Sequence, residues 1–252
     1  MSPQPRRSAW SEIVEDTLGE ALGQSGREDA ALPGTGGPAG NAKLTAWTGL
    51  IILVLALAEL ITLLDVNGLI GWHVVIGCLL IPPALLKTAT TGWRIVRYYR
   101  HAPVYVTAGP PPLPLRILGP GVVVSTVGLL GSGVVLILLG QDSARTVLLS
   151  PLGQRVDWVT VHQGMFIVWV TLTGLHVLGR LVPAVQRTVV RTTAGAPRVA
   201  GGIARAVALV ATLIVAVVLA LYMLSVSHSW RGRADGPGGY RPGHEQSQGG
   251  FP

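Results

Sequence analysis

Three histidines, His73, His162 and His176, lie inside long apolar segments of the chain, where a polar side chain needs a partner. His162 and His176 share the segment 156–182, and His73 lies near the start of the segment 69–87. Fourteen residues along a helix correspond to a rise of about 21 Å and return to nearly the same face. This separation suits two cofactor levels stacked across one bilayer, and histidine is a common axial ligand of haem iron. The spacing therefore predicts a haem site.

The preferred ligand pair is His73 with His162. Each lies only a few residues into its segment, so both side chains are expected roughly 6–9 Å from their helix starts. Two helices that run in the same direction then present two imidazoles at one depth, where they can hold one iron from opposite sides. His176 is the lesser candidate, as an axial ligand, as a hydrogen-bonding group within the bundle or as part of a quinone site. Lys87 occupies the position matching His176, and its stem is expected to carry the ammonium group to the head groups.

The composition indicates an all-α integral membrane protein, because 49% of the 252 residues are hydrophobic and only 12% are charged. The mean hydropathy is +0.52. Five apolar stretches approach or exceed the ~20 residues that a spanning helix needs. They are residues 44–64, 69–87, 117–139, 156–182 and 203–226. The sequence therefore predicts a helical bundle of five transmembrane helices, the second of them kinked at Pro82-Pro83.

The net charge of +7 follows the spans and does not indicate a nucleic-acid-binding surface. Basic residues without acidic neighbours collect in the second and fourth loops, as Arg94, Arg97, Arg100 and Arg116, and as Arg187, Arg191 and Arg198. By the positive-inside rule these loops are cytoplasmic, which places the N-terminus inside and the C-terminus outside. We expect a multi-pass protein of the cell membrane, whose partner is the lipid bilayer and not a nucleic acid.

The spans divide the chain into three regions, a cytoplasmic arm at residues 1–43, a five-span bundle at 44–226 and a disordered extracytoplasmic tail at 227–252. In the arm, apolar residues at helical spacing beside acidic ones predict an acidic amphipathic helix, followed by a Gly/Pro linker. Two hypotheses for this helix stay open: it docks on the basic loops or on a partner protein, or it is a loosely ordered helix on a mobile arm. Residues 88–115 are expected to form the longest internal loop.

Glu59 is a further polar residue in an apolar run, near the end of the first span. It could accept a proton from the ring of His73 or His162, or take part in proton movement. Together with these two histidines it could instead form a three-ligand transition-metal site. Glycines in the third and fourth spans, among them Gly128 and Gly133, either leave room for a flat porphyrin or serve close helix packing.

Residues 69–182 resemble the haem-bearing core of membrane b-type cytochromes such as the cytochrome b561 and ferric-reductase-like groups. The resemblance rests on His73 in one helix and on His162 with His176 in another. It implies transmembrane electron transfer, often through two haems, to or from a quinol, a partner protein or a metal ion. Lys87 stands where those families would have a fourth histidine, which puts a second haem in doubt.

The sequence thus favours an electron-transfer subunit that binds one haem b between the second and fourth spans, with a redox partner subunit or a quinone as its partner. Any dehydrogenase or reductase chemistry would need a separate subunit, because the chain has no nucleotide-binding glycine fingerprint and a single cysteine. Two alternatives remain open. One is a cofactor-free membrane scaffold or accessory subunit, and the other is a proton-coupled transporter that uses Glu59 and the histidines as a relay.

Overall fold

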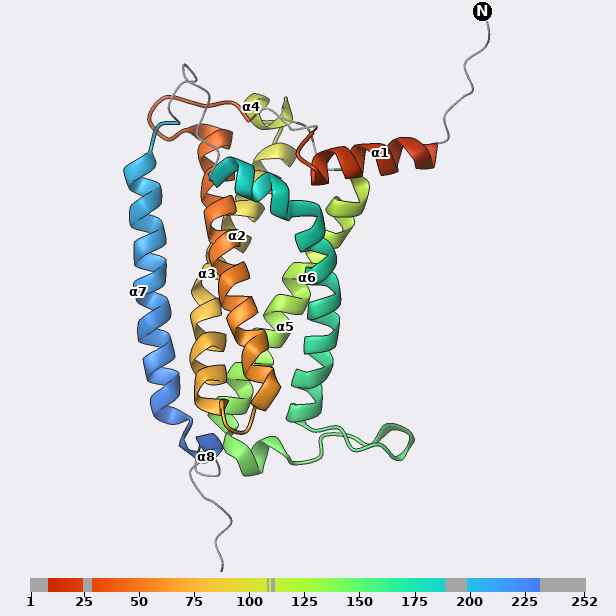
Figure 1. Ribbon diagram of the computed structural model, residues 1–252, viewed down its shortest axis with the longest axis vertical. Coiled ribbons are helices and arrows are strands. Elements are labelled where there is room, and N and C mark those ends of the chain that lie inside the picture. Colours follow the sequence, from red (N-terminus) through yellow and green to blue (C-terminus); the bar gives the residue numbers. More distant parts are fainter. Residues whose placement is uncertain (1–8, 25–28, 108, 110–111, 189–198, 232–252) are drawn as a thin grey trace, which may run out of the picture.

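The computed structural model describes residues 9–24, 29–107, 109, 112–188 and 199–231, and this part of the chain is helical (Figure 1). Five of its helices are long and apolar enough to cross a membrane. They are α2 (Gly37–Thr62), α3 (Ile70–Tyr99), α5 (Leu113–Ala144), α6 (Trp158–Thr188) and α7 (Gly202–Val226). The shorter elements are α1 (Ala9–Ala21), η1 (Leu63–Asp65), α4 (Pro103–Val106), η2 (Pro151–Gly153) and α8 (His228–Arg231). For the described residues, the expected all-helical bundle with five helices able to span a membrane is confirmed.

Successive spans run in alternating directions, so α3 and α6 run the same way through the bundle (Figure 1). We call the two ends of the bundle the α1 end and the α8 end, after the short helices that lie there. Both α3 and α6 start at the α8 end, where His73 is the fourth residue of α3 and His162 the fifth of α6. The depth match expected from the sequence therefore has its structural basis in parallel helices.

The helices extend beyond the apolar segments that revealed them. α3 continues to Tyr99, so the residues from Thr88 to Tyr99, expected to be the start of a long loop, are helical. α2 begins at Gly37, within the expected linker, with Pro38 in its first turn. The expected disordered tail begins with the helical turn α8, and residues 232–252 lie outside the described residues. A fall in hydropathy marks where a helix leaves the apolar layer and not where its hydrogen bonding stops.

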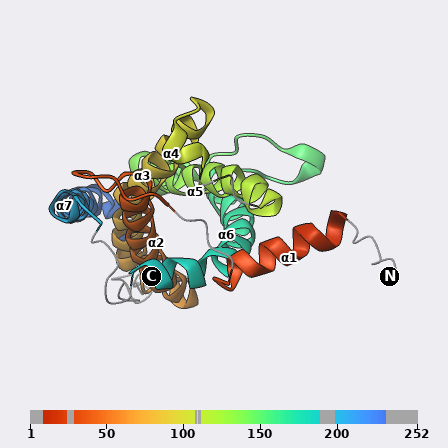
Figure 2. The same ribbon diagram turned by 90° about the horizontal axis from the view of Figure 1, so that it is seen from above.

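Two different interiors lie within the bundle. A packed core joins α3, α5 and α7, and its buried members are Val74, Cys78, Ile137, Ala220 and Met223. Cys78 is thus a small core residue. On the other side of α3, the four helices α2, α3, α5 and α6 are arranged in a ring, while α7 stands outside it (Figure 2). This second interior holds the polar side chains that the sequence singled out.

Candidate cofactor site between α2, α3, α5 and α6

A cavity of about 1150 Å³ lies among these four helices, and most of its lining is apolar. It exceeds the roughly 300–1,000 Å³ typical of ligand pockets. Polar side chains enter it at two depths. The His73 level, nearer the α8 end, consists of Glu59, His73 and His162, which line the cavity, and of Thr62 and Ser132, which lie behind the two histidines. The Lys87 level, nearer the α1 end, consists of Lys87, Thr173 and His176. The structure thus gathers all the sequence-predicted site residues around one cavity.

At the His73 level, the ring of His73 is held from α2. Its Nδ1 lies 2.9 Å from Oε1 of Glu59 and 3.0 Å from Oγ1 of Thr62. Thr62 stands three residues after Glu59, and its hydroxyl donates to the backbone carbonyl of Glu59 at 2.6 Å. The carboxylate lies against α3 at Gly77, where an added methyl group would meet Oε1 at 3.5 Å, an ordinary van der Waals contact. Two residues of one helical turn therefore fix the imidazole of the neighbouring span.

His162 is held in the same manner from α5. Its Nδ1 lies 2.9 Å from Oγ of Ser132, whose hydroxyl donates to the backbone carbonyl of Leu129 at 2.9 Å. The adjacent Gly133 is where the ring of His162 approaches the helix, because an added methyl group would lie 3.3 Å from Cε1. Gly133 therefore serves the placement of this imidazole. Gly128 has a different use, because a methyl group there would lie 2.8 Å from Sδ of Met165, which indicates close packing of α5 against α6.

These hydrogen bonds determine which nitrogen of each imidazole is free. A hydroxyl has one proton, and Thr62 and Ser132 each use it on a backbone carbonyl, so toward the histidines both act as acceptors. A carboxylate also only accepts. Nδ1 of His73, which faces the carboxylate of Glu59, is therefore the protonated nitrogen, and the same tautomer of His162 is the one compatible with the bond from Ser132 to the carbonyl of Leu129. Within the described residues neither Nε2 forms a hydrogen bond, and each carries the lone pair that can bind a metal.

The two imidazoles are also at a separation that fits a shared metal ion. Their ring centroids are 6.3 Å apart, and the ring planes are perpendicular. Metal–imidazole bonds are about 2.0–2.1 Å long and a ring nitrogen lies about 1.1 Å from its centroid, so two imidazoles across one ion have centroids roughly 6–6.5 Å apart. A nitrogen ligand whose other N–H is held by a carboxylate or another acceptor is the usual arrangement around a bound metal.

The alternative of a three-ligand metal site at Glu59, His73 and His162 does not match the structure. Among the described residues, no group of three or more histidine, cysteine, aspartate or glutamate side chains is placed to hold a metal ion. The reason is that Oε1 of Glu59 faces the protonated Nδ1 of His73 and so lies behind the ligand. The remaining donor set of two imidazoles suits haem, because the porphyrin supplies the other four ligands of the iron.

The start of α6 is fixed close to His162. Asp157 directly precedes the helix, and its Oδ1 accepts hydrogen bonds from the backbone N–H and the hydroxyl of Thr160, both at 2.8 Å. These bonds hold the pKa of the Asp157 carboxyl below its usual range, the backbone bond contributing most. This is the standard N-terminal cap of a helix. It fixes the first turn of α6, about one turn before His162.

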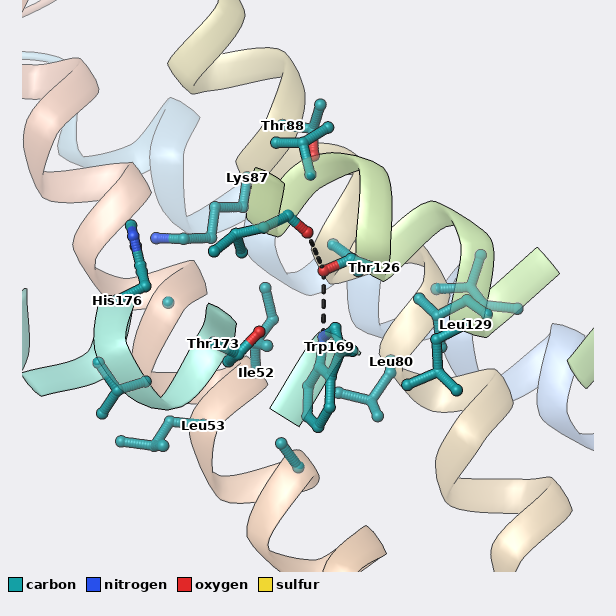
Figure 3. A pocket seen from close by; sticks show the side chains of 18 of the residues that line it. Ile52, Leu53, Leu80, Lys87, Thr88, Thr126, Leu129, Trp169, Thr173 and His176 are labelled. Carbon is teal, nitrogen blue, oxygen red and sulfur yellow. Dashed lines mark hydrogen bonds between the residues drawn. The ribbon is translucent and has the colours of Figure 1, made fainter. Parts of the chain in front are cut away.

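The Lys87 level has a different character. The expectation that Lys87 extends to the head groups is wrong: its Nζ turns into the bundle, donates to the carbonyl of Thr45 at 3.3 Å and lies beside Gly49. The helix continues twelve residues past Lys87, about 18 Å, which is too far for a lysine stem to reach its end. Figure 3 shows the ammonium group directed toward the ring of His176. No carboxylate among the described residues pairs with Lys87.

Two buried atoms of the Lys87 level have no hydrogen-bond partner within the part of the chain that the structure describes. They are Nδ1 of His176 and Oγ1 of Thr173, one turn apart on α6. Trp169 lies between the two levels, and its Nε1 donates to Oγ1 of Thr126 at 3.1 Å (Figure 3). An unpaired cation, an imidazole and a hydroxyl in an apolar cavity can together bind a carbonyl or anionic oxygen of a ligand.

Sequence reasoning identified the histidines and Glu59 but missed Thr62 and Ser132. Threonine and serine are ordinary in membrane helices, where the hydroxyl bonds to a preceding carbonyl of its own helix. Thr62 carried a weak signal, because its place three residues after Glu59 puts both on one helical face. Ser132 carried none, since it lies thirty residues from His162 in the sequence.

Comparisons with protein-family models, with curated proteins and with solved structures found no match to this chain. The resemblance to membrane b-type cytochromes consequently stays a prediction, and what this site does is argued from its geometry.

Proposed function

We propose that this protein is a membrane electron-transfer subunit that binds one b-type haem at the His73 level, with His73 and His162 as axial ligands. The observation that carries the proposal is the pair of imidazoles with free Nε2 atoms, whose centroids are 6.3 Å apart beside a large apolar cavity. Two isolated core histidines would not need matching depth, matching tautomers and a separation suited to one metal ion.

A haem held there would supply one-electron redox chemistry at a potential that the protein tunes. The chain's own residues account for the tuning. Glu59 places a carboxylate behind His73, which makes that imidazole the more basic ligand, while Ser132 gives His162 only a neutral acceptor. The mostly apolar lining lowers the polarity around the site, which favours the less charged state of the iron. The two influences oppose each other, and Glu59 is the one that a substitution can remove alone.

The Lys87 level supports a quinone as the electron partner within the membrane. A quinone combines an apolar body with carbonyl oxygens, and the Lys87 level offers an ammonium group, an imidazole and a hydroxyl in the same cavity as the proposed haem. The ammonium and the imidazole N–H would donate to a carbonyl oxygen. A redox partner subunit is the alternative, and it would accept or deliver electrons at the α8 end, nearer the His73 level.

We also infer that the protein lies in the cell membrane with its α1 end in the cytoplasm. Arg94, Arg97 and Arg100 lie on or directly after the last turns of α3, at the α1 end, and Arg116 lies in the first turn of α5 at this same end. The short connection from α2 to α3 at the α8 end contains Asp65 and no basic residue. Positive charge concentrated at one end favours the cytoplasmic side.

The first experiment is a visible absorption spectrum of the full-length protein, expressed with haem supplied and purified in detergent. We expect a b-type spectrum that sharpens on reduction with dithionite, and one haem per chain by pyridine haemochrome. A second haem per chain would require ligands at the Lys87 level and would overturn the single-haem proposal. Colourless protein under the same conditions would overturn haem binding altogether.

A proton-coupled transporter is the second candidate, and one observation favours it. Oε2 of Glu59 is buried without a hydrogen-bond partner, which leaves a place for a proton beside His73. If the protein is such a transporter, proteoliposomes made with haem-free protein should show proton flux driven by a pH difference, and Glu59→Gln should abolish this flux. The electron-transfer proposal expects no such flux. No comparable observation favours the cofactor-free scaffold, because that function gives no role to the two Nε2 atoms, which form no hydrogen bond within the described residues.

A further inference from the structure

The amphipathic helix α1 presents its apolar side chains outward and an acidic one inward. Trp10, Val14, Leu18 and Leu22 follow one another at intervals of four residues, so they form a stripe along one side of the helix. Their exposed fractions are 77%, 51%, 55% and 54%, whereas Glu20 is only 7% exposed. A helix in contact with water alone would be expected to show the reverse. The apolar stripe therefore requires another apolar surface that covers it, which we call its occupant.

The position of α1 restricts what that occupant is. The helix lies across the α1 end, at a steep angle to the spans (Figure 1), and seen from above it projects past α6 beyond the outline of the bundle (Figure 2). Its inner end is fastened by an ion pair of 2.5 Å between Glu20 and Arg180 of α6. Farther along the arm, Asp29 pairs with Arg94 of α3. The projecting half, which carries Trp10 and Val14, thus reaches outside the bundle at the level of the span ends.

Aromatic side chains at the same end mark the depth of the lipid head groups. Trp93 and Tyr99 lie on the last turns of α3, are more than half exposed and flank Arg94, to which the arm is tied. Exposed tryptophan and tyrosine beside a span are typical of the membrane–water boundary. A helix held at that depth and directed away from the bundle has lipid as its immediate neighbour, and Trp10 is itself a residue that prefers this boundary.

We propose that α1 is an interfacial helix whose stripe of Trp10, Val14, Leu18 and Leu22 is embedded in the head-group region of the surrounding lipid. Among the described residues of α1 itself, the exposed charged side chains are acidic, namely Glu12, Glu15 and Asp16, so this helix does not offer the basic face that draws a helix to anionic lipid. Apolar burial drives it, and the ion pair of Glu20 with Arg180 sets the depth and direction of the helix. The inference is independent of haem and stands or falls without it.

The test uses nitroxide labels on the full-length protein in nanodiscs of phosphatidylcholine, one copy to a disc. Val14→Cys places a label on the stripe, and Asp16→Cys is the matched control on the acidic side of the same helix. The native Cys78 is 2% exposed, so unsubstituted protein gives the labelling background. We expect the label at 14 to collide several-fold more with oxygen than with a water-soluble nickel chelate, relative to the label at 16.

Equal, water-like accessibility at both positions would overturn the proposal, and Leu18→Cys repeats the test at a second stripe position. Spin–spin broadening at position 14 in liposomes, with no lipid contact in the single-copy discs, would also overturn it, because the stripe would then meet a second copy of the chain. Neither readout involves an absorption spectrum, so it does not depend on the outcome of the haem experiment.

Discussion

The two levels of the cavity use the same residue type in different ways. At the His73 level, each imidazole has its Nδ1 held by a side chain of a neighbouring helix, and each Nε2 is left with a lone pair. At the Lys87 level, within the described residues, Nδ1 of His176 has no hydrogen-bond partner, and Lys87 donates to a backbone carbonyl without a carboxylate to pair with. Orientation, and not the mere presence of histidine, is what prepares a metal ligand.

The difference indicates two kinds of ligand. Fixed imidazoles suit a cofactor that stays bound, because their rotamers are set before it arrives. Unpaired polar atoms suit a ligand that binds and dissociates, because the free-energy cost of leaving them without a hydrogen bond applies only while the site is empty. The three predictions below test this distinction, and they are ordered by the size of the expected effect.

The sharpest contrast is between His162→Ala and His176→Ala. We expect His162→Ala to purify with less than about a tenth of the haem of the unsubstituted protein, since losing one of two axial ligands removes most of the affinity. His176→Ala should keep its haem and its reduced spectrum. Pyridine haemochrome and the spectrum measure both. Added imidazole should restore haem to His162→Ala, which shows that the variant is folded. Equal loss in the two variants would make the levels equivalent and defeat the comparison.

A smaller effect separates the two histidines of the His73 level from each other. Glu59→Gln removes a negative charge behind His73, which favours reduced iron, and Ser132→Ala removes only a neutral acceptor behind His162. Losing a partner of a metal-ligating histidine typically costs 10–100-fold in affinity, and where that loss falls on oxidised iron alone, each tenfold is 59 mV in a one-electron couple. Redox titration should therefore show a midpoint raised by roughly 60–120 mV for Glu59→Gln and by less than about 60 mV for Ser132→Ala. A lowered midpoint in Glu59→Gln would contradict the role assigned to the carboxylate.

The sequence was sufficient for the membrane architecture because spanning helices follow from length and hydropathy. It was not sufficient for helix ends. Residues from Thr88 to Tyr99 are polar enough to suggest a loop, yet α3 continues through them, since backbone hydrogen bonding does not depend on where the apolar layer stops. That extension also made the expectation for Lys87 wrong, because it places the side chain well inside the bundle.

For the site, depth alone sufficed to pair His73 with His162, because two parallel helices entered from one side put early residues at one level. The roles of Thr62 and Ser132 depend instead on how each helix is rotated against its neighbour. No local pattern contains that rotation, which is fixed by packing along the whole length of α2 on α3 and of α5 on α6. The tautomers of the two histidines depend on these hydrogen-bond partners, so they could not be predicted from the sequence either.

The smallest predicted effect concerns Lys87 itself. A buried cation without a carboxylate partner destabilises a fold, so replacing it with an apolar residue of similar length should stabilise this one. We expect Lys87→Met to raise the unfolding free energy by about 1 kcal/mol, or Tm by roughly 2–4 °C, with haem content unchanged. It should also weaken binding of decylubiquinone, measured by quenching of tryptophan fluorescence, whereas Lys87→Arg should retain it. A lower Tm would mean that the ammonium group already has a stabilising partner. The polar groups of the Lys87 level would then be held in place as those of the His73 level are, and the difference between the two levels would disappear.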